Sequence, residues 1–200
     1  MCSYVLRGEN MNKEQMAGKD LESVVSDRIK EYKKERLAHV TRCGVQAIRT
    51  GDNWQVIRSL PDFEGVHANG NQFIFDCKVC SQSSFGLSEY RAETKGSKVR
   101  QLRHMLERSQ FGVTCFFLMH WNQRQLKTFS EAAETFLFPI DASHEFWDEF
   151  AQGEIRKITR EDCRAIGVEV EWNAFGLGRV ERPDFLKAIN EHLIKTLTNC

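Results

Sequence analysis

A continuous apolar stretch from Gly112 to Trp121 has the length and character of a strand buried inside a sheet. Its central part, Val113 to Met119, is the longest apolar run in the chain. A helical membrane span needs roughly 18 such residues, so this run is long enough only for a strand. With 200 residues, the chain can bury one good core around this strand but is too short for two.

The segments around this strand alternate between helical and extended patterns. From Asp20, which we expect to cap a helix, apolar residues recur at helical spacing to about Leu37, and a helical or turn segment follows to Ile48. Two extended runs that flank Asn69-Gly70 predict a hairpin, and the order of all elements predicts a mixed α/β fold. The hairpin runs are Asp62–Val66 and Gln72–Val79; the other predicted elements are strands over Trp54–Leu60, Leu126–Phe129 and Phe136–Ile140, a polar loop over Ser81–Gly96, and helices over Lys98–Ser109, His144–Phe150, Glu161–Ile166 and Pro183–Leu197.

Neither the first residues nor the cysteines point to secretion. The opening MCSYVLRGEN lacks the apolar core of a signal peptide, so we expect a cytoplasmic protein. The seven cysteines are odd in number and irregularly spaced, which suits a reducing compartment. Residues 1–17 are polar and aperiodic and predict a flexible N-terminus. The folded domain is then expected over 18–200, with the part after about residue 140 forming a helical cover or a dimer face.

Charge is unevenly distributed along the chain. The whole chain is neutral, with 28 basic and 28 acidic residues. Residues 1–130 contain 20 basic and 14 acidic side chains, whereas residues 131–200 contain 8 and 14. We expect the first part to face a polyanion, although any cut through a neutral chain leaves some imbalance.

The sharpest chemical pattern combines Asp62 with the triplet Asp76-Cys77-Lys78. Alternate side chains of a strand share a face, so Asp76 and Lys78 point away from the core that Phe75 and Cys77 enter. The predicted hairpin brings Asp62 close to Asp76. Two convergent carboxylates suit Mg²⁺, which prefers oxygen ligands, and a lysine beside them can stabilise charge on a phosphate. The simpler alternative is a surface ion pair between Asp76 and Lys78.

This pattern resembles the signature of the PD-(D/E)XK nuclease superfamily, and its surroundings resemble the RecU-type Holliday-junction resolvases. The matching segments are NQFIFDCKVCSQSSFGL, a helix with KVRQLRHM, the strand FGVTCFFLMHW and the late GRVERPDFLKAI. They extend over about residues 18–190. The resemblance implies a single restriction-endonuclease-like domain, with a mixed central sheet flanked by helices.

The resemblance also implies a role for individual residues and a cofactor. The cofactor is Mg²⁺, with Mn²⁺ as a substitute, and the enzyme is a homodimer that resolves four-way junctions by paired nicks in DNA recombination and repair. The implied catalytic residues are Asp62 and Asp76 as metal ligands, Lys78 as the catalytic lysine, Gln101 as the glutamine near the active site, and Glu22 as an acidic ligand from the first helix. Asp27 is the alternative for the acid of that helix.

Two features depart from the family pattern. The acid before the lysine is usually Glu, whereas here it is Asp76, which is one methylene shorter. The resolvases also insert a longer stalk, thought to probe the junction centre, before the first catalytic Asp. Only about Thr50 to Leu60 is available in that place, with Trp54 and Arg58 as the candidates for DNA contact. Nuclease chemistry is therefore better supported than junction selectivity.

Further basic residues and a cysteine pair lie near the predicted site. Lysines and arginines there are expected to contact DNA phosphates, although a solvated helix face would look the same. Cys77 and Cys80 form a C-x-x-C pair, but no second pair completes a zinc site, and Cys77 is better explained as a small core residue. The candidate DNA contacts are Lys95, Lys98, Arg100, Arg103 and Arg108.

The sequence thus predicts a Mg²⁺-dependent endonuclease that acts on Holliday junctions. Two alternatives stay open. One is another nuclease of the same superfamily that cuts branched, flap or duplex DNA, because the stalk is short. The other is a DNA-structure-binding module of the same fold that does not cleave.

Overall fold

A six-stranded sheet in the order β1-β4-β5-β7-β10-β12 forms the centre of the computed structural model. The structure describes residues 16–43, 46–50, 53–58, 60–91, 96–175 and 180–198. The sheet is mixed, because β5 and β7 run parallel and the other neighbours are antiparallel. Its strands are β1 (Ala38–Arg42), β4 (Phe63–His67), β5 (Gln72–Cys80), β7 (Thr114–Trp121), β10 (Glu134–Pro139) and β12 (Val168–Glu169).

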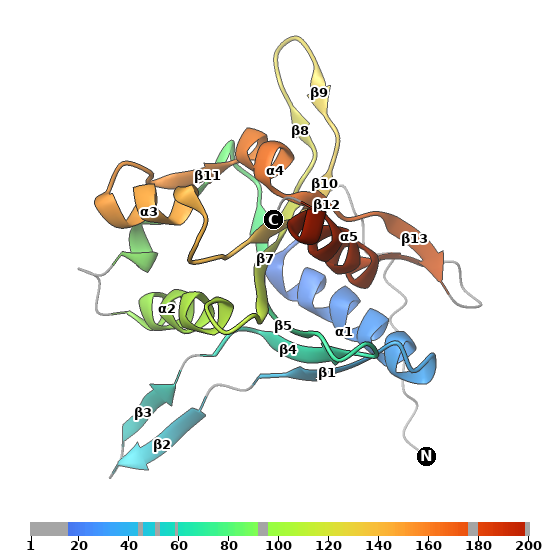
Figure 1. Cartoon of the computed structure of the whole chain (residues 1–200). Helices are drawn as coiled ribbons and strands as arrows, with labels where there is room; N and C mark the ends of the chain where they lie inside the picture. Colours follow the sequence, from blue (N-terminus) through green and yellow to red (C-terminus); the bar gives the residue numbers. More distant parts are fainter. Residues whose placement is uncertain are drawn as a thin grey trace, which may run out of the picture.

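Helices cover both faces of this sheet, and each face has its own core (Figure 1). α1 (Gly18–Lys34) and α5 (Phe185–Thr198) pack on one face, where Phe75 and Phe116 stack with ring centroids 5.2 Å apart. α2 (Ser97–Ser109) and α3 (Glu145–Gln152) lie on the other face against Phe117. The central strand β7 is therefore buried from both sides, and the expected mixed α/β fold is confirmed.

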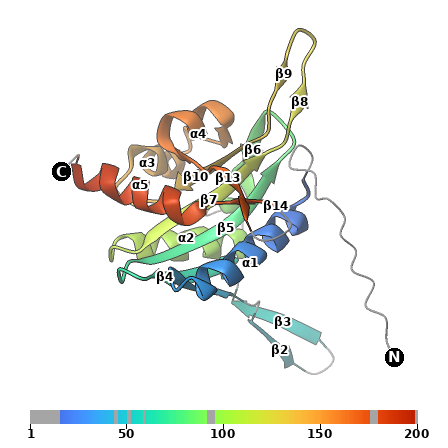
Figure 2. The ribbon, with the colours of Figure 1, turned by 90° about the vertical axis from the view of Figure 1, so that its right-hand side faces the viewer.

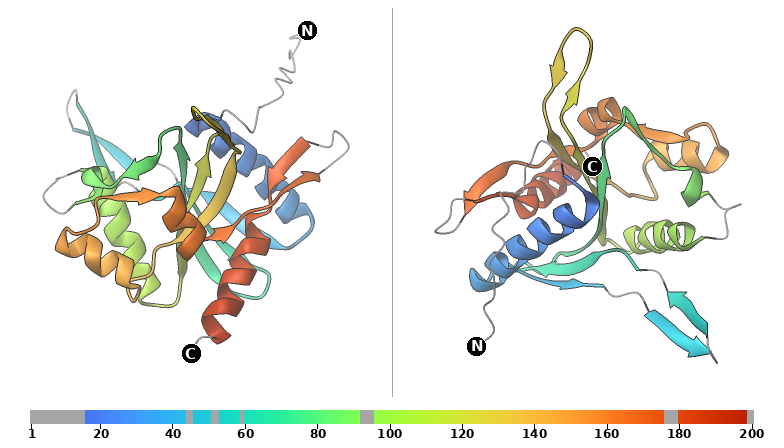
Figure 3. Two further views of the ribbon diagram at one scale, coloured as in Figure 1. Left: turned by 90° about the horizontal axis from the view of Figure 1, so that it is seen from above. Right: turned by 180° about the vertical axis from the view of Figure 1, so that it is seen from behind.

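Four two-stranded ribbons surround the central sheet. Figure 2 shows that the β8–β9 ribbon projects from the top of the body and the β2–β3 ribbon from the bottom. The view from behind also shows both ribbons standing clear of the helices (Figure 3). The ribbons are β2 (Gln46–Thr50) with β3 (Asn53–Arg58), β6 (Ser84–Gly86) with β11 (Lys157–Thr159), β8 (Arg124–Gln125) with β9 (Ser130–Glu131), and β13 (Trp172–Phe175) with β14 (Val180–Pro183).

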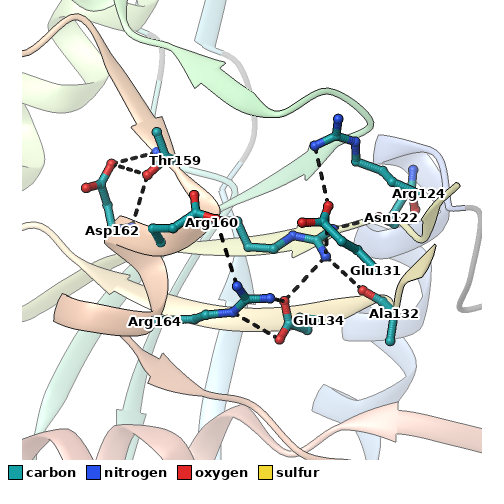
Figure 4. A network of polar contacts seen from close by, with 10 residues as sticks. Asn122, Arg124, Glu131, Ala132, Glu134, Thr159, Arg160, Asp162 and Arg164 are labelled. Carbon is teal, nitrogen blue, oxygen red and sulfur yellow. Dashed lines mark hydrogen bonds and ion pairs between the residues drawn. The ribbon is translucent and has the colours of Figure 1, made fainter. Parts of the chain in front are cut away.

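A buried arginine fastens the base of the β8–β9 ribbon to α4 (Arg160–Ile166) (Figure 4). Arg160 is 2% exposed, and its guanidinium donates to the carbonyl oxygens of Asn122 at 2.8 Å and Ala132 at 2.9 Å. It also pairs with the carboxylates of Glu131 and Glu134, at 3.7 and 3.4 Å. The two ends of the ribbon are thus held by one side chain.

The chain after the first helix is extended, which corrects the prediction of a helix to Leu37 and a helical or turn segment to Ile48. α1 ends at Lys34, and β1 and β2 follow. β1 is a five-residue edge strand, and its two apolar residues, Ala38 and Val40, are too few to mark an extended pattern after a long helical one. Asp20 lies inside the helix rather than at its cap, and its Oδ2 accepts a hydrogen bond from the backbone N–H of Ala17 at 3.2 Å.

Three other predicted elements also need correction. Leu126–Phe129 is the tip of the β8–β9 ribbon and not a strand, because its backbone turns there and Leu126 N–H donates back to the Phe129 carbonyl at 2.9 Å. The loop Ser81–Gly96 contains β6 and the short 3-10 helix η1 (Ser88–Tyr90). Pro183 ends β14, and the last helix begins two residues later. The predicted helices over 98–109, 144–150 and 161–166 are confirmed, as are the β4–β5 hairpin and the strands over 54–60 and 136–140, with small shifts of their ends.

The expected flexible N-terminus lies mostly outside the described residues. Met16, at the start of the described chain, is buried, and both its N–H and its carbonyl bond to the Asn122 side chain, at 2.7 and 2.9 Å. Among the helices that the structure describes, none is long and apolar enough to cross a membrane.

Candidate active site

The β4–β5 hairpin brings the two predicted carboxylates together. Its turn contains Gly70 with φ of 91°, a left-handed conformation that glycine adopts without strain. The register pairs Phe63 with Phe75, which places Asp62, the residue before β4, beside Asp76. Gly65 permits this packing, because a Cβ there would come within 2.6 Å of the Phe73 ring.

Backbone hydrogen bonds fix both carboxylates. The N–H of Asp62 donates to Asp76 Oδ1 at 3.3 Å, and the N–H of Cys77 donates to Asp62 Oδ2 at 2.8 Å. Asp76 is 1% exposed, whereas Asp62 is half-buried at the end of the strand. The two side chains are therefore oriented by the hairpin itself, and the prediction that they converge is confirmed.

Lys78 completes the cluster from the same strand. Its ammonium forms an ion pair with Asp76 Oδ2, and in the described part of the chain this buried oxygen has no hydrogen bond besides. Nζ lies 5.5 Å from the Phe117 ring centroid and 5.7 Å from that of Tyr90. Burial lowers the pKa of Lys78, but the charge of Asp76 outweighs it and holds the pKa above its ordinary value. The lysine is therefore charged at neutral pH.

The electrostatics of the two aspartates differ from those of an ordinary surface pair. Burial, followed by the negative charge of Asp76, raises the pKa of Asp62 to about 7. The two carboxylates therefore resist being ionised together, and a cation bound between them would favour the ionised form of Asp62. A plain surface ion pair between Asp76 and Lys78 does not describe this site, because the Asp76 and Lys78 side chains are only 2% and 14% exposed.

These donors fit a hard divalent cation. Asp62 and Asp76 offer carboxylate oxygens only, which is the ligand chemistry of Mg²⁺, and Asp76 Oδ2 is a buried acceptor with a single charged partner. No group of three or more His, Cys, Asp or Glu side chains within the described residues is arranged to hold a metal ion. Protein ligation would thus come from these two aspartates, with water or phosphate oxygens supplying the rest, as is usual for Mg²⁺.

Gln101 and Tyr90 border the cluster. Gln101 on α2 is 6% exposed, and its Nε2 donates to the carbonyl of Leu60 at 3.2 Å, two residues before Asp62. It therefore ties α2 to the segment that carries the first aspartate. Tyr90 in η1 is 2% exposed and shields Lys78. Tyr90 was not identified from the sequence, because it lies in a polar stretch. The only signal of its burial was a large aromatic side chain among small polar residues.

Glu22 lies on α1, on the face of the sheet opposite α2, and pairs with Arg42 of β1. Its charge acts on the Cys77 thiol, so its carboxylate is near the site, but it makes no contact with either aspartate among the interactions of the described residues. Asp27 pairs with Lys30 at 2.7 Å. Glu22 remains the nearer of the two acids and stays a prediction as a ligand.

The two cysteines of the C-x-x-C pair face opposite cores. Cys77 packs on the α1 side of the sheet, whereas Cys80 is buried on the α2 side. They cannot chelate one ion together. Burial raises the pKa of Cys77 well above its ordinary value, and the neighbouring Asp62 and Asp76 raise it further, so the thiol stays protonated.

The residues predicted to contact DNA differ in their exposure and in their partners. Arg100 and Arg103 are exposed on α2, whereas Lys98 there pairs with Glu89. Arg108 donates to Gln72 Oε1 at 3.3 Å. Trp54 and Arg58 belong to β3 of the projecting ribbon, but their side chains, and all of Lys95, lie outside the described residues.

A family model matches most of the chain. The chain matches the family model described as RecU: Recombination protein U, over residues 16–191. Among solved structures it is similar to Hjc, a Holliday junction resolvase from the archaeal hyperthermophile Archaeoglobus fulgidus, at 14% identity. That similarity covers 74% of this chain and 93% of the other, with a TM-score of 0.38, which is too low to support an argument. No curated protein matches the chain.

Proposed function

The chain belongs to the Recombination protein U family of Holliday-junction resolvases, and on this premise we propose that it is a Mg²⁺-dependent endonuclease whose active site consists of Asp62, Asp76 and Lys78. The family match over residues 16–191 supports the resolving nuclease. The observation that carries the site is the buried Asp76 carboxylate, which pairs with Lys78 through one oxygen and accepts the Asp62 N–H with the other.

The residues of this chain have distinct tasks in the proposed reaction. Asp62 and Asp76 would hold the divalent ion, which supplies Lewis-acid activation of water and neutralises phosphate charge. The backbone N–H of Cys77 keeps Asp62 oriented. Lys78, held charged beside Asp76, stabilises the negative charge that develops on the scissile phosphate. Gln101 keeps the Leu60–Asp62 segment in place against α2.

The β2–β3 ribbon is the proposed junction-contacting element. The sequence indicated only Thr50–Leu60 in the place of the family's stalk, but the structure has a two-stranded ribbon over Gln46–Arg58 that projects from the body (Figure 2). It leads directly to Leu60 and the first aspartate. We propose that two copies of the chain act as a homodimer, because paired nicks need two active sites related by symmetry.

The proposal is tested by cleavage of a synthetic four-way junction beside a matched linear duplex and a flap. Each DNA is incubated with wild-type protein in Mg²⁺ and in EDTA, and with Asp76→Asn and Asp27→Asn variants in Mg²⁺. We expect symmetric paired nicks in the junction alone. We expect Mg²⁺ to be required, Asp76→Asn to abolish cleavage while DNA binding persists, and the Asp27→Asn control to cleave like the wild type.

Other outcomes would change the proposal in defined ways. Cleavage of all three DNAs would retain the nuclease and remove the junction selectivity. Binding of the junction without cleavage in any metal would point to a structure-binding module. Unimpaired cleavage by Asp76→Asn would place the active site elsewhere in the chain.

A further inference from the structure

A groove of about 530 Å³ lies between α2 and α3, on the same face of the sheet as Lys78. Leu102 and Leu106 of α2 form one wall, and Trp147 and Phe150 of α3 form the other. Tyr90 closes the end nearest the active site, where its ring centroid is 5.7 Å from Lys78 Nζ. The groove therefore begins one aromatic ring away from the catalytic lysine.

Three arginines line this groove: Arg91, Arg103 and Arg156. They come from three separate segments, namely the end of η1, the middle of α2, and the residue before β11. The lining that the structure describes contains no carboxylate. The guanidinium groups of Arg103 and Arg156 face one opening, and an anion between them would offset the repulsion between their charges.

The backbone holds these arginines in place. The N–H of Leu87 donates to the Arg156 carbonyl at 2.9 Å, and β6 pairs with β11 beside it. Arg91 packs on Gly153, the left-handed residue that ends α3, where an added Cβ would lie 2.9 Å from the Arg91 guanidinium. The groove is thus bordered by paired strands and helix ends, and the left-handed backbone at its rim, with φ of 87° at residue 153, favours glycine.

Arg103 and Arg156 are available to a ligand. Both are exposed, and among the described residues no ion pair includes either of them. This distinguishes them from Lys98 on the same helix, whose charge is matched by Glu89. Arginine forks bind phosphate oxygens in a bidentate manner, which suits two exposed guanidinium groups across an open groove.

We propose that the α2–α3 groove binds phosphates of the DNA strand that leaves the active site, through Arg103 and Arg156. This inference rests on the proposed function, which supplies the polyanion, and it adds a defined path for the strand past Tyr90. Arg156 was not among the residues that the sequence indicated. Contacts of this kind recognise the backbone and not the base, so the groove contributes affinity without sequence preference.

The test measures the salt dependence of junction binding in EDTA, by fluorescence anisotropy of a labelled four-way junction. The variants are Arg103→Gln, Arg156→Gln and the double variant. The matched control is Lys34→Gln, which removes one exposed charge from the end of α1 on the opposite face of the sheet. Arg91 is left intact because its packing on Gly153 makes a folding defect the simpler result.

Each groove variant is expected to weaken binding and to reduce the slope of log affinity against log salt by about 0.9, the value for one lost phosphate contact. The double variant is expected to lose about twice that slope, and Lys34→Gln none. Circular dichroism checks that all variants are folded. The affinity loss is expected to be the same for junctions of different sequence.

Three results would overturn the inference. If the double variant keeps the wild-type slope while the wild-type protein cleaves the junction, the groove does not bind DNA and the proposed function still stands. An acidic segment of a partner protein then becomes the better occupant of the groove. If Lys34→Gln changes the slope as much as the groove variants do, the effect is one of overall charge. If the wild-type protein neither binds nor cleaves the junction, the proposed function fails together with the groove.

Discussion

At the scale of single residues, the site concentrates charge in a place that excludes water. Asp76 is almost fully buried, and its two oxygens are committed to the Asp62 backbone and to Lys78. Burying an ionised carboxylate is costly unless it is paired. The lysine therefore has a structural task as well as the proposed catalytic one, and Asp62 is the member of the cluster whose charge remains poorly compensated.

The raised pKa of Asp62 predicts how stability changes with pH in metal-free protein. The native carboxyl has a pKa of about 7, because burial and then Asp76 disfavour its charge, whereas the unfolded carboxyl has its ordinary value of 3.8. Between these values the native state binds more protons, so the free energy of unfolding falls as the pH rises from about 4 to 7. Urea unfolding in EDTA at several pH values measures this, and Asp62→Asn should remove that part of the decline.

Asp27→Asn is the matched control for that measurement, because the Asp27 side chain on α1 is 41% exposed and pairs with the solvent-accessible Lys30. It should retain the pH dependence of the wild type. An unchanged decline in Asp62→Asn would show that Asp62 titrates normally and that its environment is wetter than the structure indicates.

At the scale of elements, the sequence predicted those strands and helices in which the spacing of apolar residues shows which face is buried. β5 shows strict alternation, with Phe73 and Phe75 entering one core and Asp76 facing the other, and the Asn69-Gly70 turn marks its hairpin. The site could be predicted because all its charged members lie on this hairpin. The helix α2 likewise has one apolar face and could be placed within one residue.

The elements that sequence reasoning missed owe their conformation to partners distant in the chain. β1 is held by pairing with β4, through contacts such as Ala38 with His67, and β6 by pairing with β11. β1 and β6 are short and have few apolar residues, namely Ala38 and Val40 in β1 and Phe85 in β6. The register of these strands depends on where the partner lies, so local propensity did not reveal them.

The β8–β9 ribbon depends on one buried side chain, which gives a direct prediction. Replacing Arg160 with Ala leaves two backbone carbonyls and the carboxylates of Glu131 and Glu134 without their shared donor. We expect a loss of about 3 kcal/mol in the free energy of unfolding. Chemical denaturation measures this loss.

Arg164→Ala provides the comparison within the same network. Arg164 pairs with Glu134 at 2.7 Å, but its side chain is 45% exposed, so its removal should cost less than about 1 kcal/mol. Equal losses in the two variants would contradict the view that Arg160 anchors the ribbon.

At the scale of the whole molecule, the acidic second part of the chain builds core and cover. Five of its aromatic residues are buried in the core on the α2 side of the sheet. They are Phe136, Phe138, Phe146, Trp147 and Phe150. The basic first part contributes the β4–β5 hairpin, α2 and the β2–β3 ribbon. The elements of the proposed active site and of the proposed junction contact thus come from the basic part of the sequence.

The molecule thus presents its proposed chemistry between two projecting ribbons and beside one arginine-lined groove (Figure 2). The proposed function places the divalent ion on Asp62 and Asp76, and we expect these two carboxylates, with water as the other ligands, to bind it in the absence of DNA.

Thermal unfolding of the protein with and without Mg²⁺ or Mn²⁺ tests that requirement most directly. An ion that binds only the native state stabilises it by about 2.7 kcal/mol at one hundred times its dissociation constant, which for a chain of this size raises the melting temperature by several degrees. We predict this increase for the wild type, for Asp27→Asn and for Lys34→Gln, and its loss in Asp76→Asn. An increase of the same size in Asp76→Asn, or none in the wild type, would contradict the assignment of Asp62 and Asp76 as the metal site.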